Sequence, residues 1–439
     1  MKRFLSILFS GLLGVAAQAE WRSHQGDARR SGVATTDVNA PLKPVWRRAS
    51  PVAPATAWTG PAKWDAYSGN KGLQSLRNFD PAFYVTIADG TVYFGSSVDH
   101  AVHALDARTG KERWVHFADG PVRLPPTLDG GRVYFGSDDG AAYCVAAKTG
   151  DRVWRFAPKP EAREIVNNGS FISPFPIRTG VVVHEGNAYF AGSLLPWRES
   201  LLCSVDAASG KPEGAGRYVK VHQSMTLQGA PLLAGDALLI PQGRSPMRKF
   251  KLQDGSSMGQ VADAGGVHCL LTEDNRILSG PKTQKYKDNV LQLSEAATGK
   301  RLLTLNGVYR AAVADGILYF QQGQHLEALD YAAYIGVQSE RAKLKAAKKA
   351  TKEALAALTE REQAARKWRV SHPVSANLIV TPTRIITGSH DVVHVFNRET
   401  GVAEASLPVE GTAYGLAVGE GLLIVSTDHG HITAFGKPE

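Results

Sequence analysis

Residues 85–114 read VTIADGTVYFGSSVDHAVHALDARTGKERW, and residues 127–154 read TLDGGRVYFGSDDGAAYCVAAKTGDRVW. Both stretches have the same order of short alternating strands, glycine turns and a final tryptophan. A repeat of about 40 residues built from four short strands is the sequence signature of a propeller blade. One such sheet cannot bury both of its faces, so several must stack around a common axis. The stretch therefore predicts an all-β propeller.

Each copy ends in a glycine turn followed by a tryptophan. Trp114 and Trp154 each follow the glycine of a Thr-Gly turn by four residues. A tryptophan at that place can pack flat against the neighbouring repeat and bury a large apolar area. In later copies the same spacing leads to Gly214, Gly259, Leu303 and Ala405.

Six weaker copies follow at 181–211, 231–259, 270–303, 311–330, 377–405 and 416–435. We therefore predict eight blades in one domain over residues 20–439. The last copy stops without its turn and tryptophan, and the missing piece stands near the other end as Pro44-Val45-Trp46-Arg47. We predict that residues 44–47 complete the last blade, because such closure removes exposed sheet edges. Residues 48–80 are expected to form a long loop over the rim or face.

The sixth copy is interrupted. Asp106 precedes Trp114 by eight residues, but Asp330 precedes Trp368 by 38. The insert is rich in Ala, Lys, Glu and Leu, which favours helix. A single helix of about 30 residues would separate its ends by about 45 Å, whereas neighbouring strands lie about 4.8 Å apart. Residues 331–368 are therefore predicted to form a helical hairpin inserted in the sixth blade.

The start of the chain predicts export. Residues 1–19 combine a basic start, a short apolar run and a small-x-small cleavage site, as in a Sec-type secretory signal. No later stretch is apolar and long enough to cross a bilayer. We expect a periplasmic or secreted protein. The three cysteines are interpreted as small buried hydrophobes, with a Cys144–Cys203 bridge as the alternative.

The positive charge is concentrated in one segment. The formal net charge is +9, and residues 340–369 alone hold ten Lys or Arg and four Glu. The rest of the chain is close to neutral, which disfavours a general nucleic-acid-binding surface. We expect a monomer that binds no nucleic acid.

The repeat A-x-D-G-x-V-Y-F-G-S … A-L-D-A-x-T-G-K-x-x-W stands at Ala88–Trp114 and, with small changes, at Leu128–Trp154. It closely resembles the repeat of the pyrroloquinoline-quinone-type (PQQ-type) propellers. The resemblance covers residues 80–436 and the N-terminal strand. Residues 21–32, WRSHQGDARRSG, are also similar to the N-terminal segment of exported bacterial members.

The resemblance implies two functional classes. Some family members are quinoprotein alcohol or sugar dehydrogenases, and others are cofactor-free propellers such as the lipoprotein scaffold of the outer-membrane assembly machine. Both share the repeat, so the repeat does not choose between them. The family's alcohol dehydrogenases carry adjacent cysteines and hold Ca²⁺ through Glu, Asn and Asp oxygens. This chain has no adjacent cysteines and no matching segment. We expect a non-catalytic binding or scaffold protein without cofactor, metal or catalytic residues; a divergent PQQ-dependent alcohol or sugar dehydrogenase with Ca²⁺ is the alternative.

Loops that enter the first strand of each blade meet on one face. They supply the candidate channel-mouth residues Arg123, Asn168, Ser170, His222, Arg310 and Asn377. Arg123 and Arg310 hold similar positions and would grip an anionic ligand or a partner's carboxylates. Pairing with local carboxylates or carbonyls is the alternative.

The hairpin supplies a second candidate surface. Its turn is expected near residues 349–351, with Thr351 as a helix cap. Arg341, Lys345, Lys348 and Lys352 are the candidate contacts. A solvated, helix-favouring charged face is one interpretation. The other is a docking arm for a protein partner or an anionic envelope surface.

Overall fold

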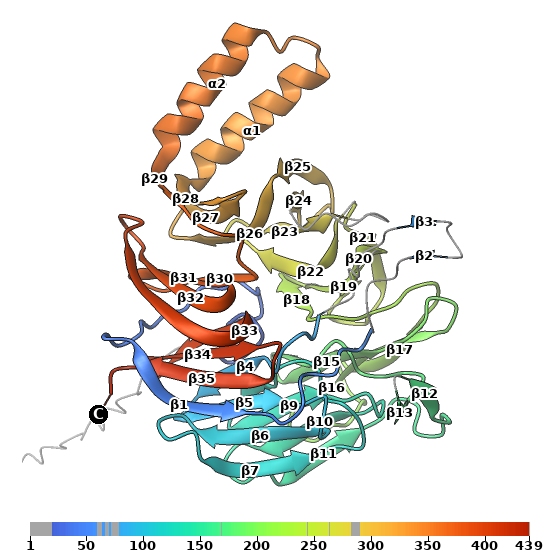
Figure 1. Cartoon of the computed structure of the whole chain (residues 1–439). Coiled ribbons are helices and arrows are strands. Elements are labelled where there is room, and N and C mark those ends of the chain that lie inside the picture. Colours follow the sequence, from blue (N-terminus) through green and yellow to red (C-terminus); the bar gives the residue numbers. More distant parts are fainter. Residues whose placement is uncertain are drawn as a thin grey trace, which may run out of the picture.

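Short strands form where β-branched and aromatic residues alternate between glycine turns. The computed structural model describes residues 20–58, 64–65, 70–71, 79–167, 169–243, 245–262, 264–281 and 290–438. The expected signal, residues 1–19, and parts of the expected loop at 59–63, 66–69 and 72–78 lie outside the described residues. Over these described residues the chain is all-β, with many small antiparallel sheets and two helices (Figure 1).

Within the described residues, six sheets have four strands each, and every strand pairs with its neighbour in sequence. The first two sheets are β4 (Val85–Ala88), β5 (Thr91–Gly95), β6 (Ala101–Asp106), β7 (Glu112–Phe117), and β8 (Thr127–Asp129), β9 (Arg132–Gly136), β10 (Ala142–Ala146), β11 (Arg152–Phe156). The next two are β14 (Val182–His184), β15 (Asn187–Gly192), β16 (Ser200–Asp206), β17 (Tyr218–His222), and β18 (Leu232–Ala234), β19 (Ala237–Gln242), β20 (Ser245–Lys251), β21 (Ser257–Gln260). The last two are β22 (Ala264–Leu271), β23 (Arg276–Pro281), β24 (Val290–Glu295), β25 (Arg301–Asn306), and β26 (Val308–Ala314), β27 (Ile317–Gln322), β28 (His325–Asp330), β29 (Arg366–Ser371). Two-stranded ribbons are formed by β2 (Trp64–Asp65) with β3 (Asn70–Lys71) and by β12 (Ile165–Asn167) with β13 (Ser170–Ile172).

A seventh, larger sheet joins the two ends of the described chain. Its strands are β30 (Asn377–Val380), β31 (Arg384–Gly388), β32 (His390–Asn397), β33 (Ala403–Gly419), β34 (Leu422–Thr427), β35 (His431–Gly436) and β1 (Lys43–Ala49). The long strand β33 pairs with β32 up to Thr412 and with β34 from Ala413 onward. Strand β1 lies antiparallel to β35, with Trp46 opposite Ala434. Residues 44–47 therefore occupy the outer place beside the last strand.

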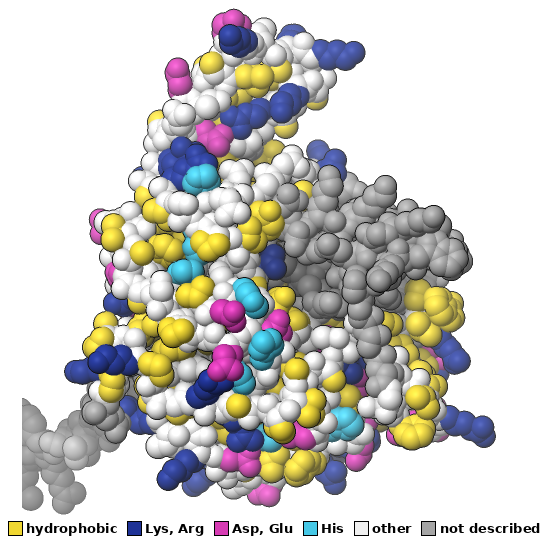
Figure 2. Space-filling model, in the orientation of Figure 1, with side chains coloured by type: hydrophobic (Ala, Val, Ile, Leu, Met, Phe, Trp, Pro, Cys, Tyr) yellow, Lys and Arg dark blue, Asp and Glu magenta, His cyan; other side chains and the backbone are white. Residues whose placement is uncertain are grey.

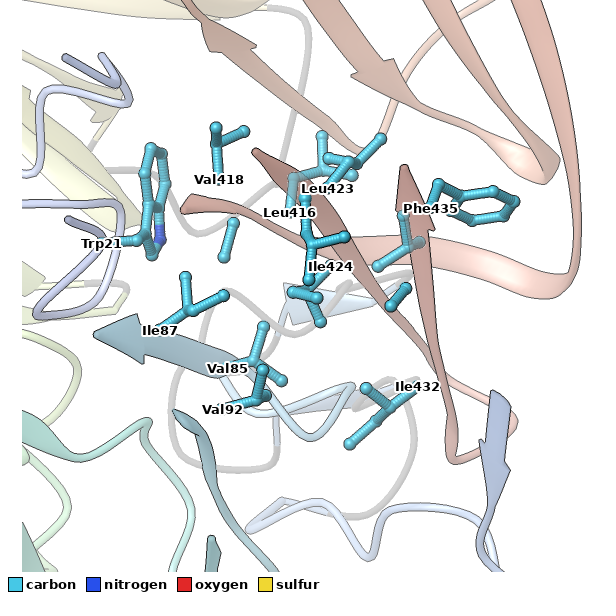
Figure 3. Close-up of a cluster of buried hydrophobic side chains, with 14 of the residues drawn as sticks. Trp21, Val85, Ile87, Val92, Leu416, Val418, Leu423, Ile424, Ile432 and Phe435 are labelled. Atoms are coloured by element: carbon cyan, nitrogen blue, oxygen red, sulfur yellow. The ribbon is translucent and has the colours of Figure 1, made fainter. Parts of the chain in front are cut away.

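The first and last sheets share one apolar core. Strand β33 contacts β4, and Ile87 packs there with Val418 and Ile424 (Figure 3). Trp21, which precedes all the strands, lies in the same cluster and is 2% exposed. The arrangement places the two ends of the sheet series against each other, as a propeller requires.

The tryptophans pack as their spacing predicts. A Cβ on Gly150 would lie 2.7 Å from the Trp114 ring, and the Trp114 Nε1–H donates to the Ala147 carbonyl at 2.9 Å. Trp154 makes the same pair of contacts with the next sheet, over Gly210 and to the Ala207 carbonyl at 3.0 Å. Only glycine leaves room for the flat indole at these turns.

One assignment from spacing is wrong. In the third copy the residue in the tryptophan register is Tyr218 rather than Gly214, because Tyr218 pairs with Ser204 as Trp114 pairs with Ala104. The connection between β16 and β17 is longer than in the first copy, so a fixed count from the glycine misses the aromatic residue. The Tyr218 ring lies over Gly255 of the following sheet.

Two helices, α1 (Tyr331–Ala346) and α2 (Lys352–Ala365), connect β28 to β29 and point away from the sheets (Figure 1). The Asp330 side chain caps α1 by accepting from the Ala333 N–H, and Thr351 caps α2 by accepting from the Ala354 N–H. Tyr334 and Ile335 anchor the base against the preceding sheet. Among the described residues, neither helix nor any other is long and apolar enough to span a bilayer. All three cysteines are buried and free.

Candidate functional site

An N-terminal segment, residues 20–39, crosses the first strands of sheets that lie far apart in sequence. The Trp21 carbonyl accepts from the Ile87 N–H at 3.0 Å, and the Gly32 carbonyl accepts from the Val380 N–H at 2.8 Å. Between these points, carbonyls of this segment accept from Leu128, Leu233 and Leu271. The segment thus contacts the first strands of five sheets, β4, β8, β18, β22 and β30, and we call it the floor.

Beside this segment lie four side chains that we call the channel cluster: Tyr84, Arg310, Asn377 and Tyr414. Tyr84 directly precedes β4 and Arg310 lies in β26, whereas Asn377 and Tyr414 lie in β30 and β33 of one sheet. The Arg310 Nε–H donates to the Ala376 carbonyl at 2.7 Å, and the Asn377 amide donates to the Tyr414 carbonyl at 2.8 Å. The structure therefore brings together two of the residues selected from sequence, Arg310 and Asn377.

The floor touches the channel cluster directly. The His24 ring meets the Tyr84 ring edge-on, with centroids 5.0 Å apart. The Gln25 amide donates to the Asn377 Oδ1 at 3.4 Å. Burial raises the pKa of Tyr84, and the nearby Tyr414 raises it further, although Arg310 opposes the shift. The Tyr84 hydroxyl is therefore protonated at neutral pH.

Arg123 lies in a separate arginine–aspartate cluster, which consists of Asp80, Arg123, Asp138 and Arg178. The Arg123 guanidinium contacts Asp138 through Nε at 2.8 Å and Asp80 through Nη1 at 2.7 Å. Arg178 donates to both oxygens of Asp138, at 2.9 and 2.7 Å. Pairing with local carboxylates, the alternative that the sequence left open, thus describes the position of Arg123.

The charges of this cluster balance in a buried setting. Burial by itself would raise the pKa of Asp138, but Arg178 and Arg123 outweigh it and lower that pKa. Burial raises the pKa of Asp80, whose Oδ1 has no hydrogen-bond partner among the described residues. A buried ion network of this kind fixes the loops that carry it, because removing one partner would leave an uncompensated charge.

The other selected residues lie elsewhere. His222 ends the outer strand β17 instead of lying in a loop that enters a first strand, and its Nε2 lies 3.0 Å from the Gly255 carbonyl. Ser170 begins β13 of the short ribbon, where Val166 and Phe171 are exposed. Asn168 lies outside the described residues.

Sequence reasoning missed Tyr84 and Tyr414, because aromatic residues beside a strand are typical of the core.

The hairpin divides into two parts. Near the base, Arg341 pairs with Glu362 at 2.8 Å, and Arg361 pairs with Glu340 at 2.6 Å, so these ion pairs join the two helices. The outer part, which we call the lysine tip, consists of Lys343, Lys345, Lys348, Lys349 and Lys352. All five are exposed, and in the described residues none forms an ion pair. Figure 2 shows Lys and Arg side chains along this projection.

The family model described as outer membrane protein assembly factor BamB matches residues 43–302, which is more than half of the chain. The chain therefore belongs to this family of PQQ-like repeat propellers.

Curated relatives match over limited segments. A serine/threonine-protein kinase, AfsK of Streptomyces griseus, is 34% identical over 173 residues, which are 36% of this chain and 19% of the kinase. A 1-butanol dehydrogenase (cytochrome c) of Thauera butanivorans is 29% identical over 198 residues, 42% of this chain and 25% of the dehydrogenase. The chain thus spans a quarter or less of the length of these relatives.

Solved structures share the fold over nearly the whole chain. Quinohemoprotein alcohol dehydrogenase from Comamonas testosteroni has a TM-score of 0.62 at 12% identity, covering 97% of this chain and 82% of that one. A europium-containing methanol dehydrogenase has a TM-score of 0.61 at 11% identity, covering 96% and 99%. At these identities the likeness concerns the fold alone.

In the described part of the chain, neither the channel cluster nor the arginine–aspartate cluster offers the oxygen ligands of a calcium–quinone centre. Ca²⁺ takes about six to eight oxygen ligands, with carboxylates among them. The buried carboxylates Asp80 and Asp138 pair with Arg123 and Arg178, and the channel cluster itself contains no carboxylate. Among the described residues, no group of three His, Cys, Asp or Glu is arranged to hold a metal ion.

Proposed function

We propose that this chain is an exported, non-catalytic propeller that works in the cell envelope by binding other components, with the hairpin as its docking arm. The observation that carries the proposal is the lysine tip. Long cationic side chains that have no ion-pair partner within the described chain, presented on a projection, create a positive field that attracts an anionic surface. The family description, which names an outer-membrane assembly factor, supports an envelope location and a protein partner.

The scaffold behind this arm is a single ring of eight blades over residues 20–439. Six four-stranded sheets support the count, and the seventh sheet divides into two blades at the change of partner in β33. On this basis the hairpin is inserted in the sixth blade. Arg310 and Asn377 of the channel cluster are the residues we propose for contact with a small anionic ligand or a partner's carboxylate.

The experiment compares two hairpin variants with a matched control. One variant replaces residues 331–365 by Ala-Arg-Thr-Gly-Lys, the turn found at 107–111 in the first copy. The second changes Lys345, Lys348 and Lys352 to Glu. The control changes Lys111, Lys148 and Lys211 to Glu, which alters charge equally on exposed turns of the sheets.

Binding is measured in two ways. A photo-crosslinker at Ala350 reports protein contacts in the envelope, and co-sedimentation with phosphatidylglycerol vesicles reports contact with an anionic surface. We expect both hairpin variants to lose at least one of these interactions, and the control to keep it. Unchanged crosslinks and unchanged sedimentation in both hairpin variants would contradict the docking role.

A divergent PQQ-dependent alcohol or sugar dehydrogenase is the second candidate, favoured by the matched segment of the 1-butanol dehydrogenase. It is tested by adding PQQ and Ca²⁺ to the pure protein and measuring bound quinone absorbance and dye reduction with butanol or glucose. Stoichiometric quinone with turnover would replace the binding proposal.

A further inference from the structure

A groove opens at the base of the hairpin, between the sheet β26–β29 and the strands β30–β32 of the next one. Its lining consists of Ile317, Tyr319, Ala328, Lys367, Trp368, Pro382, Thr383, Asn397, Arg398 and Glu399. The floor is mostly apolar, since Tyr319 and Trp368 pack there with ring centroids 6.2 Å apart. Lys367 directly precedes Trp368 and is exposed at the rim.

In the first sheet, the residue directly before the tryptophan is an arginine that is held by its own sheet. There Arg113, which precedes Trp114, contacts Asp106 at 2.8 Å and donates to the Thr91 hydroxyl at 2.5 Å. The third sheet repeats this clamp, with Arg217 paired to Asp206 at 2.5 Å. In both sheets the arginine lies back across its own strands and is neutralised by the aspartate.

The hairpin removes this clamp from its own sheet. The register makes Asp330 equivalent to Asp106 and Lys367 equivalent to Arg113. Asp330 instead caps α1 by accepting from the Ala333 N–H at 2.8 Å. Ile317 stands where the first sheet has Thr91. In the part of the chain that the structure describes, Lys367 therefore has no carboxylate partner, and the groove beside it has an apolar wall.

Of the two cationic side chains that line the groove, Arg398 is already paired with a carboxylate of the described chain and Lys367 is not. The Arg398 Nε–H donates to the Tyr319 hydroxyl at 2.9 Å, and its Nη2 pairs with Asp315 at 2.6 Å. Glu399 lies in the exposed turn on the opposite side of the groove. The groove thus offers an apolar slot with one ammonium at its edge that no described carboxylate neutralises, directly after the helix that leads back from the lysine tip.

We propose that this groove is the anchor site for an acidic segment of a protein partner. An aromatic or aliphatic side chain of the segment enters between Tyr319, Trp368 and Pro382, and a neighbouring carboxylate pairs with Lys367. This inference rests on the proposed docking role of the hairpin. A protein fits better than a lipid surface, because a helix of 14 residues separates the tip from the groove by about 20 Å. A membrane that meets the tip would not reach the groove.

The test uses fluorescein-labelled decapeptides and fluorescence anisotropy on the full-length protein. One peptide contains Asp, Glu and Gly with a single central Phe, and the other has Ala in place of that Phe. We expect the Phe peptide to bind about tenfold more tightly, as burial of one large apolar side chain implies. Lys367→Glu and Ile317→Asp should each weaken the Phe peptide at least fivefold, whereas the control Lys148→Glu should not.

The outcomes separate the groove from the docking role. Equal binding of the two peptides, or unchanged binding to Lys367→Glu and Ile317→Asp, would overturn the groove proposal and leave the docking role standing. The Lys345, Lys348 and Lys352 to Glu variant should weaken both peptides by a similar factor. If it binds both peptides as the unmodified protein does, the lysine tip takes no part in capturing this segment, and the part of the inference that rests on the docking role is overturned. The groove itself is judged on Lys367→Glu and Ile317→Asp.

A second measurement needs no altered groove. The Trp368 Nε1–H donates to the Arg398 carbonyl, and its NMR signal is assigned by loss in Trp368→Phe. We expect the Phe peptide, and not the Ala peptide, to shift this signal in the unmodified protein. An unmoved signal at saturating Phe peptide would overturn the proposal, as would binding of anionic vesicles with no binding of the Phe peptide.

Discussion

The seams between neighbouring sheets are closed in two ways. Within the described chain, four seams use a tryptophan whose indole N–H donates to a carbonyl of the next sheet: Trp46 to Ala107, Trp114 to Ala147, Trp154 to Ala207 and Trp368 to Arg398. In each case the ring lies over a turn glycine. At two other seams a different side chain takes the place of the tryptophan. Tyr218 covers Gly255, and the buried Lys249 ammonium donates to the Ala296 carbonyl at 2.7 Å.

Across these seams the backbone carbonyl that accepts the hydrogen bond is more constant than the side chain that donates it. Both Trp154 and Lys249 satisfy the carbonyl that follows the third strand of the next sheet. A buried carbonyl without a partner costs about 1–3 kcal/mol, so a seam that loses its indole must supply another donor or leave the group to water. A repeat can therefore lose its tryptophan and still pack closely against the next sheet.

The largest effect should come from removing an indole. Trp154→Ala deletes a ring that is 6% exposed and its hydrogen bond to the Ala207 carbonyl. We expect the free energy of unfolding to fall by about 3–5 kcal/mol, as for other buried tryptophans. Urea unfolding followed by circular dichroism measures the change. A loss below about 1 kcal/mol would mean that the seams do not depend on their aromatic rings.

Acid should weaken the seam beneath the hairpin. His372 packs against His394 and Phe396 of the next sheet, and burial lowers its pKa to about 4. The unfolded chain takes up this proton near pH 6.5, so the stability present above pH 6.5 is lost as the pH falls toward 4, by up to about 3 kcal/mol. The His372→Gln variant should lose less stability between about pH 7.5 and 5. Equal acid sensitivity in both proteins would contradict this assignment. Burial also lowers the pKa of His394, which contributes a residual slope in both.

Two glycines of similar backbone angle give a sharper comparison. Gly150 has φ +76° and lies under Trp114, whereas Gly131 has φ +73° and a Cβ added there would meet no described atom within 4 Å. Both alanine substitutions incur the left-handed backbone strain of about 1–2 kcal/mol. Only Gly150→Ala also clashes with an indole, which should add about 1–3 kcal/mol. Equal losses in thermal unfolding would show that the indole does not need the glycine.

The smallest effect concerns the hydroxyl of Tyr218. This buried oxygen has no hydrogen-bond partner among the residues that the structure describes, so Tyr218→Phe should leave stability unchanged or raise it slightly. Trp154→Phe removes a donor that is used, and should cost about 1 kcal/mol or more. Parallel urea titrations of the two variants decide the point, because a substantial loss in Tyr218→Phe would indicate a bridging partner.

Local sequence was sufficient where the repeat is regular. The Gly-to-Trp spacing predicted the packing of Trp114 and Trp154, because turn and ring lie within a few residues of each other. The same count failed at Tyr218, since a longer connection changes spacing without changing strand register. Arg310 and Asn377 were found together because both stand at the start of a first strand.

Contacts between distant segments had no local signal. Asp80 meets Arg123 from the far end of a long loop, and nothing in the sequence around Arg123 indicates that carboxylate. The crossing of residues 20–39 over five sheets was likewise invisible, because its bonds involve backbone groups that every residue possesses. His222 was misplaced because β17 extends further than its polar residues indicate.

The path of residues 20–39 has a consequence for how the protein is made. Trp21 hydrogen-bonds to Ile87, which is synthesised early. Gly32 and Ala34, however, hydrogen-bond to Val380, and β1 pairs with β35, which is synthesised last. Pairing between residues so far apart gives a high contact order, which slows folding. During synthesis the early sheets must therefore stay soluble while one flank is uncovered. We therefore expect folding to depend on chaperones. We also expect a truncated product that lacks the last strands to aggregate.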